Sequence, residues 1–132
     1  MTHSKQQQRI MEELGLRRRT ELASLLEMSD GFLSQVANGK REISSEYKVR
    51  CVERITRPGF RFNIFWFEDP EKHPFWVPED YWMNAFDPDI QVLAQMKPEI
   101  LKMLERVAKL PKEKQEAWIE VARTMFGLTG EK

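Results

Sequence analysis

The sequence of 132 residues predicts a mainly helical, all-α fold, and three observations support this prediction. Residues 21–41 contain two short runs in which apolar side chains recur every three or four positions, separated by a turn. Residues 98–126 contain two further apolar stripes with helical spacing. Between them, residues 57–89 hold 10 of the 14 aromatic residues and five of the seven prolines, which disfavours long regular structure there.

This pattern divides the chain into three parts. We expect a helical head over residues 1–60, an aromatic- and proline-rich connector over residues 61–89, and a helical oligomerisation tail over residues 90–132. The net charge is zero, but residues 1–61 hold 12 Lys and Arg against 8 Asp and Glu, whereas residues 62–132 hold 9 against 13. A basic head before an acidic remainder suits a domain that binds an anionic partner, although chance variation along a short chain would give the same asymmetry.

The outer helices of the head are bounded by clear capping signals. The first helix ends at Gly15, with Leu16 folding back over it, and its inward residues are Ile10, Met11 and Leu14. The last helix of the head begins after Ser44, with Glu46 in its first turn, where an acidic residue is favourable. Its inward residues are Val49, Val52 and Ile55. Cys51 in the same helix is expected to be a small buried hydrophobe rather than a reactive thiol.

Between these helices, two shorter ones are joined by a break at Glu27–Met28–Ser29. In the first, Leu22, Ala23 and Leu26 lie on one face, and the small Ala23 lets the two helices cross closely. The second begins at Asp30, with Ser29 as its N-cap, and its inward residues are Leu33 and Val36. Asn38–Gly39 supplies a left-handed C-cap. Two short helices at this spacing can lay the second one in a DNA major groove.

This stretch resembles the helix-turn-helix of the lambda-repressor-like (XRE or Cro type) regulators. The residues that carry the resemblance are Leu22–Ala23, Met28–Ser29, Phe32–Leu33–Ser34–Gln35 and Asn38–Gly39–Lys40–Arg41, with a weaker continuation through Val52–Glu53–Arg54–Ile55–Thr56. Roughly the first half of the chain is covered. Where the family has glycine in the turn, this chain has Glu27, and a non-glycine residue in a left-handed turn costs on the order of 1 kcal/mol.

The resemblance implies which residues meet DNA. The base-reading positions would be Asp30, Gly31, Ser34 and Gln35. Gln35 is the strongest candidate, because its amide can pair with both hydrogen-bonding groups of adenine. Asp30 could accept a hydrogen bond from cytosine, but an acidic residue also stabilises a helix start, and we favour this structural interpretation. Phe32 could touch a thymine methyl group, although packing against the neighbouring helix is the better interpretation.

The same resemblance implies phosphate contacts at the start of the first helix of the motif and after its second helix. The expected residues are Arg17, Arg18 and Arg19 at the first place, and Asn38, Lys40 and Arg41 at the second. Arginine and lysine bind phosphate well, although any single one of these side chains could simply be solvated.

The aromatic middle of the chain is too apolar to be a solvated linker, so it must pack on the head, on the tail or on a partner. Its aromatic residues are Phe60, Phe62, Phe65, Trp66, Phe67, Phe75, Trp76, Tyr81, Trp82 and Phe86. The run from Phe60 to Phe67 fits a short strand and a short helix equally poorly.

In the tail, one apolar stripe follows Pro98 and a second follows the break at Leu110–Pro111 and ends at Gly127. The first stripe consists of Ile100, Leu101, Leu104, Val107 and Ala108, and the second of Ala117, Trp118, Val121, Ala122 and Met125. We expect a helical hairpin in which Leu104 and Val107 face Trp118 and Val121. A second subunit would then cover the rest of this apolar surface, because such short helices need an opposing surface.

Composition excludes several other classes of protein. One cysteine rules out an internal disulfide framework, and no apolar stretch is long enough to span a membrane or to act as a signal peptide, so we expect a soluble cytoplasmic protein. The two histidines, His3 and His73, lack partners at metal-ligand spacing, and no catalytic motif is present. We therefore expect no enzyme activity, no cofactor and no bound metal.

The sequence thus predicts a DNA-binding transcriptional regulator, most similar to a phage or prophage repressor, that binds a pseudo-palindromic operator as a dimer. One head reads too few base pairs for useful specificity, which is why a dimer is expected. The alternative is a protein-interaction module, such as an antitoxin, in which the aromatic middle binds a partner protein.

Overall fold

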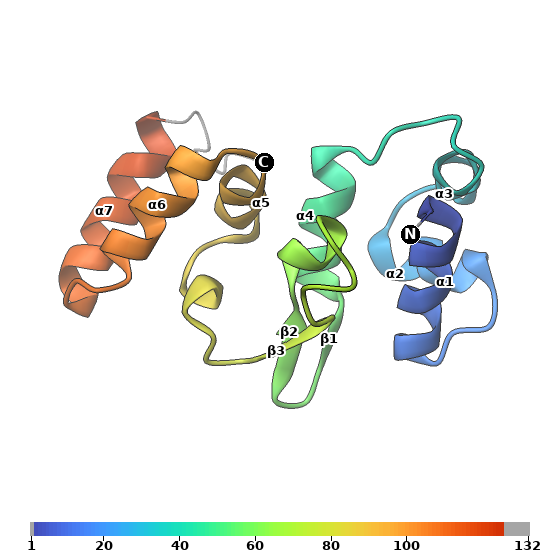
Figure 1. The fold of residues 1–132 in the computed structure, drawn as a ribbon, viewed down its shortest axis with the longest axis horizontal. Helices are drawn as coiled ribbons and strands as arrows, with labels where there is room; N and C mark the ends of the chain where they lie inside the picture. The colour runs from blue at the N-terminus through green and yellow to red at the C-terminus, as the bar shows by residue number, and fades with distance from the viewer. Residues whose placement is uncertain (1, 126–132) are drawn as a thin grey trace. The chain divides into compact units, whose positions relative to one another are not determined.

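A computed structural model of the chain describes residues 2–125 (Figure 1). Seven α-helices and a small three-stranded sheet lie within these residues, which confirms the mainly helical class. The contacts divide the chain into two compact units, residues 1–77 and residues 78–132. The expected helix end at Gly127 lies outside the described residues.

The first unit begins with four helices. These are α1 (His3–Leu14), α2 (Arg19–Leu26), α3 (Asp30–Ala37) and α4 (Ser45–Arg54). α1 packs on α3, and α2 packs on both α3 and α4. The helix boundaries follow the predicted caps: Gly15 adopts a φ of 68°, and the Leu16 N–H donates to the Met11 carbonyl at 2.8 Å. The hydroxyls of Ser29 and Ser44 accept hydrogen bonds from the first turns of α3 and α4.

The core of these four helices contains most of the predicted apolar residues. Its fully or nearly fully buried side chains are Ile10, Leu22, Ala23, Leu26, Leu33, Val36, Tyr47, Cys51, Val52 and Ile55. Val49 is only half-buried, whereas Tyr47, which the sequence did not single out, takes a central place. Burial raises the pKa of the Cys51 thiol far above its ordinary value, and this agrees with its expected role as a small hydrophobe.

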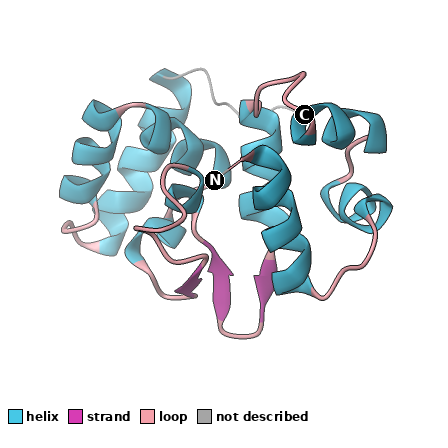
Figure 2. Ribbon diagram, turned by 45° about the vertical axis from the view of Figure 1, so that its right-hand side comes forward, coloured by secondary structure: helices cyan, strands magenta, loops and turns pink. Residues whose placement is uncertain are grey.

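The aromatic segment does not form a connector, because the two units divide it between them. Its first part forms β1 (Thr56–Arg57), β2 (Phe60–Phe62), the 3-10 helix η1 (Ile64–Phe67) and β3 (Trp76–Pro78). The strands are ordered β1-β2-β3, and β1 pairs antiparallel with β2 (Figure 2). The run from Phe60 to Phe67, which fits neither a strand nor a helix pattern in the sequence, is therefore a short strand followed by a short 3-10 helix. The head extends to residue 77 rather than ending at 60.

This part of the aromatic segment packs on α4. Phe62 lies at the centre of the cluster, with its ring centroid 5.2 Å from that of Phe67 and 5.0 Å from that of Phe75. Phe67 in turn lies 5.8 Å from Tyr47 of α4. The buried Asn63 amide donates to the Pro74 carbonyl at 3.0 Å and closes the intervening loop. The rings thus enlarge the core of the first unit.

The second unit contains the 3-10 helix η2 (Trp82–Ala85) and the helices α5 (Pro88–Met96), α6 (Pro98–Val107) and α7 (Lys112–Met125). α5 packs on η2 and α6, and α6 packs on α7. Pro98 begins α6 as predicted. Arg123 near the end of α7 pairs with both Asp87 and Asp89 at the start of α5, and this holds the last helix to the unit.

The inward face of α7 differs from the predicted one. Leu104 and Val107 of α6 are buried within the chain, and Trp118 is half-buried, but Val121 is 57% exposed and Met125 is 72% exposed. Ala122 is buried, and Ile119 is half-buried. α7 is therefore rotated, so that Trp118, Ile119 and Ala122 face inward. The predicted pairing of Val121 with α6 is wrong, and Leu104 and Val107 are not available to a second subunit.

We predict that a fragment of residues 1–77 folds on its own, whereas a fragment of residues 1–56 does not. The shorter fragment lacks Phe67, which packs on Tyr47, and the aromatic cluster around Phe62. Removing one large buried aromatic side chain already costs about 3–5 kcal/mol. Far-ultraviolet circular dichroism in a urea titration measures this difference. A cooperative transition of equal midpoint in both fragments would contradict the role given to the aromatic cluster.

Candidate nucleic-acid interface

α3 presents a polar face to solvent because its apolar residues point into the core. Leu33 and Val36 are buried, while Asp30, Gly31 and Gln35 are exposed and Ser34 is half-buried. A Cβ atom added at Gly31 would meet nothing within 4 Å. Packing within the chain therefore does not require glycine at this position. The four residues expected to read bases lie on or beside the accessible face of one helix.

At the start of α3, Ser29 caps the helix and Asp30 lies near a cationic side chain. The Ser29 Oγ accepts a hydrogen bond from the Phe32 N–H at 3.0 Å and caps the helix. The Asp30 carboxylate lies 3.9 Å from the Arg19 Nε, and both of these side chains are substantially exposed. Asp30 is thus an acidic first-turn residue with a cationic neighbour, which agrees with its structural interpretation.

At the other end of α3, the chain turns sharply and exposes several polar groups. Gly39, with a φ of 75°, is the left-handed residue, whereas Asn38 has a φ of −85°. The N–H groups of Lys40 and Arg41 donate to the Gln35 carbonyl at 2.8 Å and 3.2 Å. The Arg41 guanidinium lies 5.8 Å from the centroid of the Phe32 ring. Asn38, Lys40 and Arg41 are all exposed, so their side chains are accessible beside the end of α3.

Phe32 is packed rather than free. Its ring lies 6.2 Å from the ring of Tyr47 in an edge-to-face arrangement, and the residue is half-buried. The packing interpretation made from the sequence is therefore confirmed.

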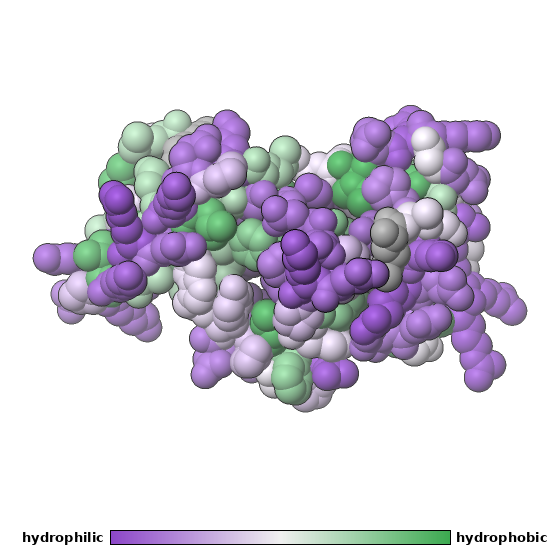
Figure 3. Space-filling view, viewed as in Figure 1, coloured by the Kyte–Doolittle hydropathy of each residue, from purple (hydrophilic) through white to green (hydrophobic). Residues whose placement is uncertain are grey.

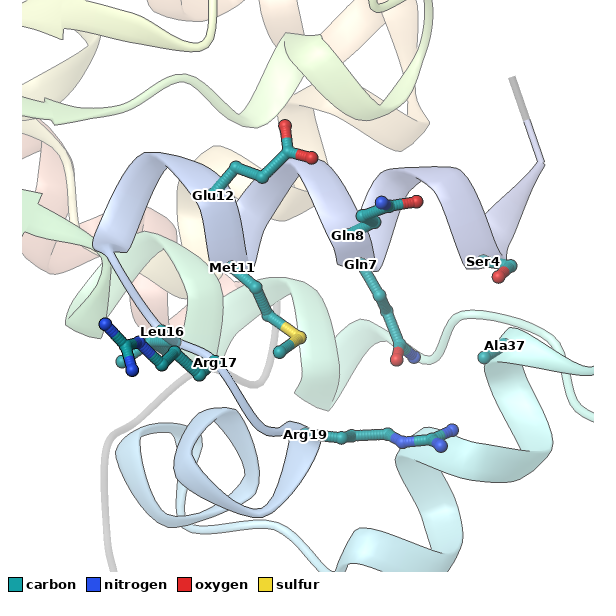
Figure 4. A pocket seen from close by; sticks show the side chains of 9 residues that line it. All are labelled: Ser4, Gln7, Gln8, Met11, Glu12, Leu16, Arg17, Arg19 and Ala37. Atoms are coloured by element: carbon teal, nitrogen blue, oxygen red, sulfur yellow. The ribbon is translucent and has the colours of Figure 1, made fainter.

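The three consecutive arginines before α2 are not equivalent. The Glu21 Oε1 accepts hydrogen bonds from the Arg17 and Arg18 backbone N–H groups, at 3.1 Å and 2.9 Å, which fixes the loop that carries them. The side chains of Arg17 and Arg18 are exposed and, within residues 2–125, have no ion pair. Arg19 is half-buried and points toward α3 (Figure 4). Arg17 and Arg18 are the freer cations.

A shallow groove of about 410 Å³ lies between α1, the start of α2 and the end of α3. Its lining residues are Ser4, Gln7, Gln8, Met11, Glu12, Leu16, Arg17, Arg19 and Ala37 (Figure 4). The surface over α1 is predominantly hydrophilic on the face shown in Figure 3. The groove is mostly polar and has no acidic pair at its centre.

Gln7 is a residue of this site that the sequence analysis missed. Its Nε2 donates a hydrogen bond to the Leu33 carbonyl at 2.7 Å, and only 4% of the residue is exposed. Its position was a usable signal, because Gln7 lies three residues before Ile10 and seven before Leu14. It therefore shares the inward face of α1 with them.

The turn between α2 and α3 depends on a long-range contact. Glu27 adopts a left-handed φ of 53°, as expected from the position where the resembled family has glycine. The Arg50 Nη1 of α4 donates to the Leu26 carbonyl at 3.1 Å and lies 3.6 Å from the Glu27 carboxylate. Arg54 also pairs with Glu27. The side chain of Glu27 thus tethers the strained turn to α4.

No group of three or more potential metal-ligating side chains occurs among residues 2–125. Within the same residues, no helix is both long and apolar enough to cross a membrane. No protein-family model, curated protein or solved structure matches this chain.

We predict that Glu27→Ala and Glu27→Gly differ in stability although both lose the ion pairs with α4. Alanine keeps the left-handed strain, whereas glycine removes it, so the glycine variant should be more stable than the alanine variant by about 1 kcal/mol. The exposed ion pairs themselves contribute about 0–1 kcal/mol. Urea unfolding of both variants and the original chain measures these differences. Equal stability of the two variants would show that the turn carries no strain.

Proposed function

We propose that the chain is a sequence-specific DNA-binding transcriptional regulator whose α2 and α3 form a lambda-repressor-like helix-turn-helix. The observation that carries this proposal is the accessible polar face of α3, followed directly by the exposed cationic residues Lys40 and Arg41. A repressor of the phage or prophage type, acting in the cytoplasm, is the form of regulator that the sequence resemblance favours.

In this proposal, α3 enters the major groove and Gln35 reads a base. Gln35 lies one turn into the helix and is exposed, and its amide offers the donor and acceptor that adenine requires. Ser34 can contact a base or a phosphate. Gly31 lets the helix approach the DNA closely, which accounts for a glycine that internal packing does not require. Asp30, beside Arg19, has a mainly structural part.

Phosphate contacts come from the loop before α2 and from the turn after α3. Arg17 and Arg18 precede α2, and Lys40 and Arg41 follow α3. Asn38 and Arg19 complete the set expected from the sequence, but Arg19 is partly engaged by Asp30. Such contacts bind DNA of any sequence and set the register of the reading helix.

We also propose that the protein binds DNA as a dimer, because one reading helix contacts too few base pairs. A two-fold axis would place two copies of α3 roughly 34 Å apart on a pseudo-palindromic site. The exposed residues Val121 and Met125 of α7 are better candidates for the dimer contact than Leu104 and Val107, which are already buried. Sedimentation of the full chain at micromolar concentration tests this part of the proposal, and a monomer would contradict it.

The alternative, a protein-interaction module that uses the aromatic middle, has weaker support. Phe62, Trp66, Phe75 and Phe86 are buried within the chain, and Phe60 is the one aromatic residue of that segment that is exposed rather than half-buried or buried. Purification with a small protein in a fixed ratio would favour this alternative. Selection and sequencing of DNA fragments bound by the purified chain tests the regulator and supplies its site.

We predict that Gln35→Ala weakens binding to the selected site by about 1–3 kcal/mol while hardly changing binding to random duplex. The amide reads a base edge, so its loss removes discrimination rather than general affinity. Fluorescence anisotropy with the two duplexes measures the ratio. Equal losses on both duplexes would assign Gln35 to solvent or to a phosphate.

We predict that Arg17→Gln combined with Arg18→Gln weakens binding to all DNA and flattens its dependence on salt. Each lost phosphate contact changes the slope of log affinity against log salt by about 0.9. Lys112→Gln combined with Lys114→Gln is the matched control, because it removes two exposed charges from the second unit. A slope unchanged by the arginine variant, or changed as much by the control, would refute these contacts.

A further inference from the structure

One buried polar contact connects α1 to the middle of α3. The Gln7 Nε2 donates to the Leu33 carbonyl at 2.7 Å across 26 residues of sequence, and the bond is buried. The Gln7 side chain extends from α1 toward α3 (Figure 4). The neighbouring buried glutamine, Gln6, accepts from His3 of its own helix at 3.3 Å. Gln7 therefore differs from Gln6, because its partner belongs to the helix whose polar face is exposed.

The carbonyl that Gln7 binds lies directly before the proposed base-reading residues of α3. It belongs to the peptide that joins Leu33 to Ser34, and Gln35 follows directly. Within α3 this carbonyl faces the Ala37 N–H of the helix ladder, and its second lone pair is open to another donor. Gln7 occupies that second position. The helix does not need the bond for its own ladder, so the bond fixes α3 relative to α1.

Apolar packing alone would not fix the rotation of α3 about its own axis. The apolar packing of α1 on α3 is not directional, so it permits small rotations of α3 about its axis. A hydrogen bond in a dry interior requires a particular distance and angle. Rotation of α3 would swing Gln35 across the base edge that it is proposed to read, and the Gln7 bond opposes this rotation.

We infer that Gln7 is a positioning residue, which sets the rotation of α3 and thereby the discrimination between DNA sequences. This inference rests on the proposed function for its DNA part, but the effect of Gln7 on α3 is a property of the chain alone. Gln7 itself has only 4% of its surface exposed and need not touch DNA.

The test replaces Gln7 by methionine, which has a similar length and no hydrogen-bond donor. The matched control is Gln91→Met in α5, which removes a buried bond of the same kind, from the Gln91 Nε2 to the Phe86 carbonyl at 2.9 Å. Nuclear magnetic resonance and amide hydrogen exchange report on α3 in both variants of the full chain. Anisotropy measures binding to the selected site and to random duplex.

For Gln7→Met we expect shifted resonances and faster exchange in residues 33–37, together with a fall of about tenfold in the ratio of selected to random affinity. The size follows from loss of the Gln35 base contact. The Gln91→Met control should lose as much thermal stability and keep both α3 and the ratio unchanged. A ratio that is unchanged in Gln7→Met, or that falls equally in the control, would overturn the inference.

The two proposals fail in different ways. If the chain selects no DNA, the proposed function is wrong, and the resonances of residues 33–37 still decide whether Gln7 positions α3. If α3 is undisturbed in a folded Gln7→Met variant, the positioning role is wrong whatever the chain binds. Gln7→Leu is the second variant, and failure of both variants to fold would assign Gln7 to stability instead.

Discussion

The arrangement of the first unit depends on α4, and above all on Arg50. Its guanidinium donates a hydrogen bond to the Leu26 carbonyl at the carboxyl end of α2, where helix carbonyls lack partners within the helix. It also lies beside the Glu27 carboxylate in the turn. Another residue of α4, Tyr47, contacts Phe32 of α3 and Phe67 of the aromatic cluster. One helix of ten residues therefore fixes the turn before α3 and joins the helical core to the aromatic one.

The local features of this fold were predictable because their causes are local. Gly15, Ser29, Ser44 and Pro98 each act on the helix end beside them, and all four mark the boundaries observed. The polar face of α3 was also predictable, since the positions of Leu33 and Val36 determine which side of the helix is buried. These inferences need only the geometry of a single helix.

The features that were missed depend on partners far away in the sequence. Helical spacing places Trp118 and Val121 on adjoining parts of α7, but only contact with α6 and the pairs of Arg123 decide which of them turns inward. The aromatic segment has no spacing that identifies its partner, so its packing on α4 could not be derived. The role of Gln7 was hidden because a polar residue among apolar ones reveals nothing until its acceptor is known. Which cations are paired also depends on distant residues. Glu27 pairs with two arginines of α4, whereas Arg17 and Arg18 have no ion pair among the described residues.

The tether at Glu27 has a consequence for how this sequence can diverge. A glycine at position 27 would relieve the backbone directly, and Arg54 would then be free to change, while Arg50 would still be kept by its bonds to the backbone carbonyls. With glutamate in place, the residues at 27 and 54 constrain one another. Relatives of this chain should therefore fall into two groups, one with an acidic residue at 27 and a cation at 54, and one with glycine at 27 and a freely varying position 54.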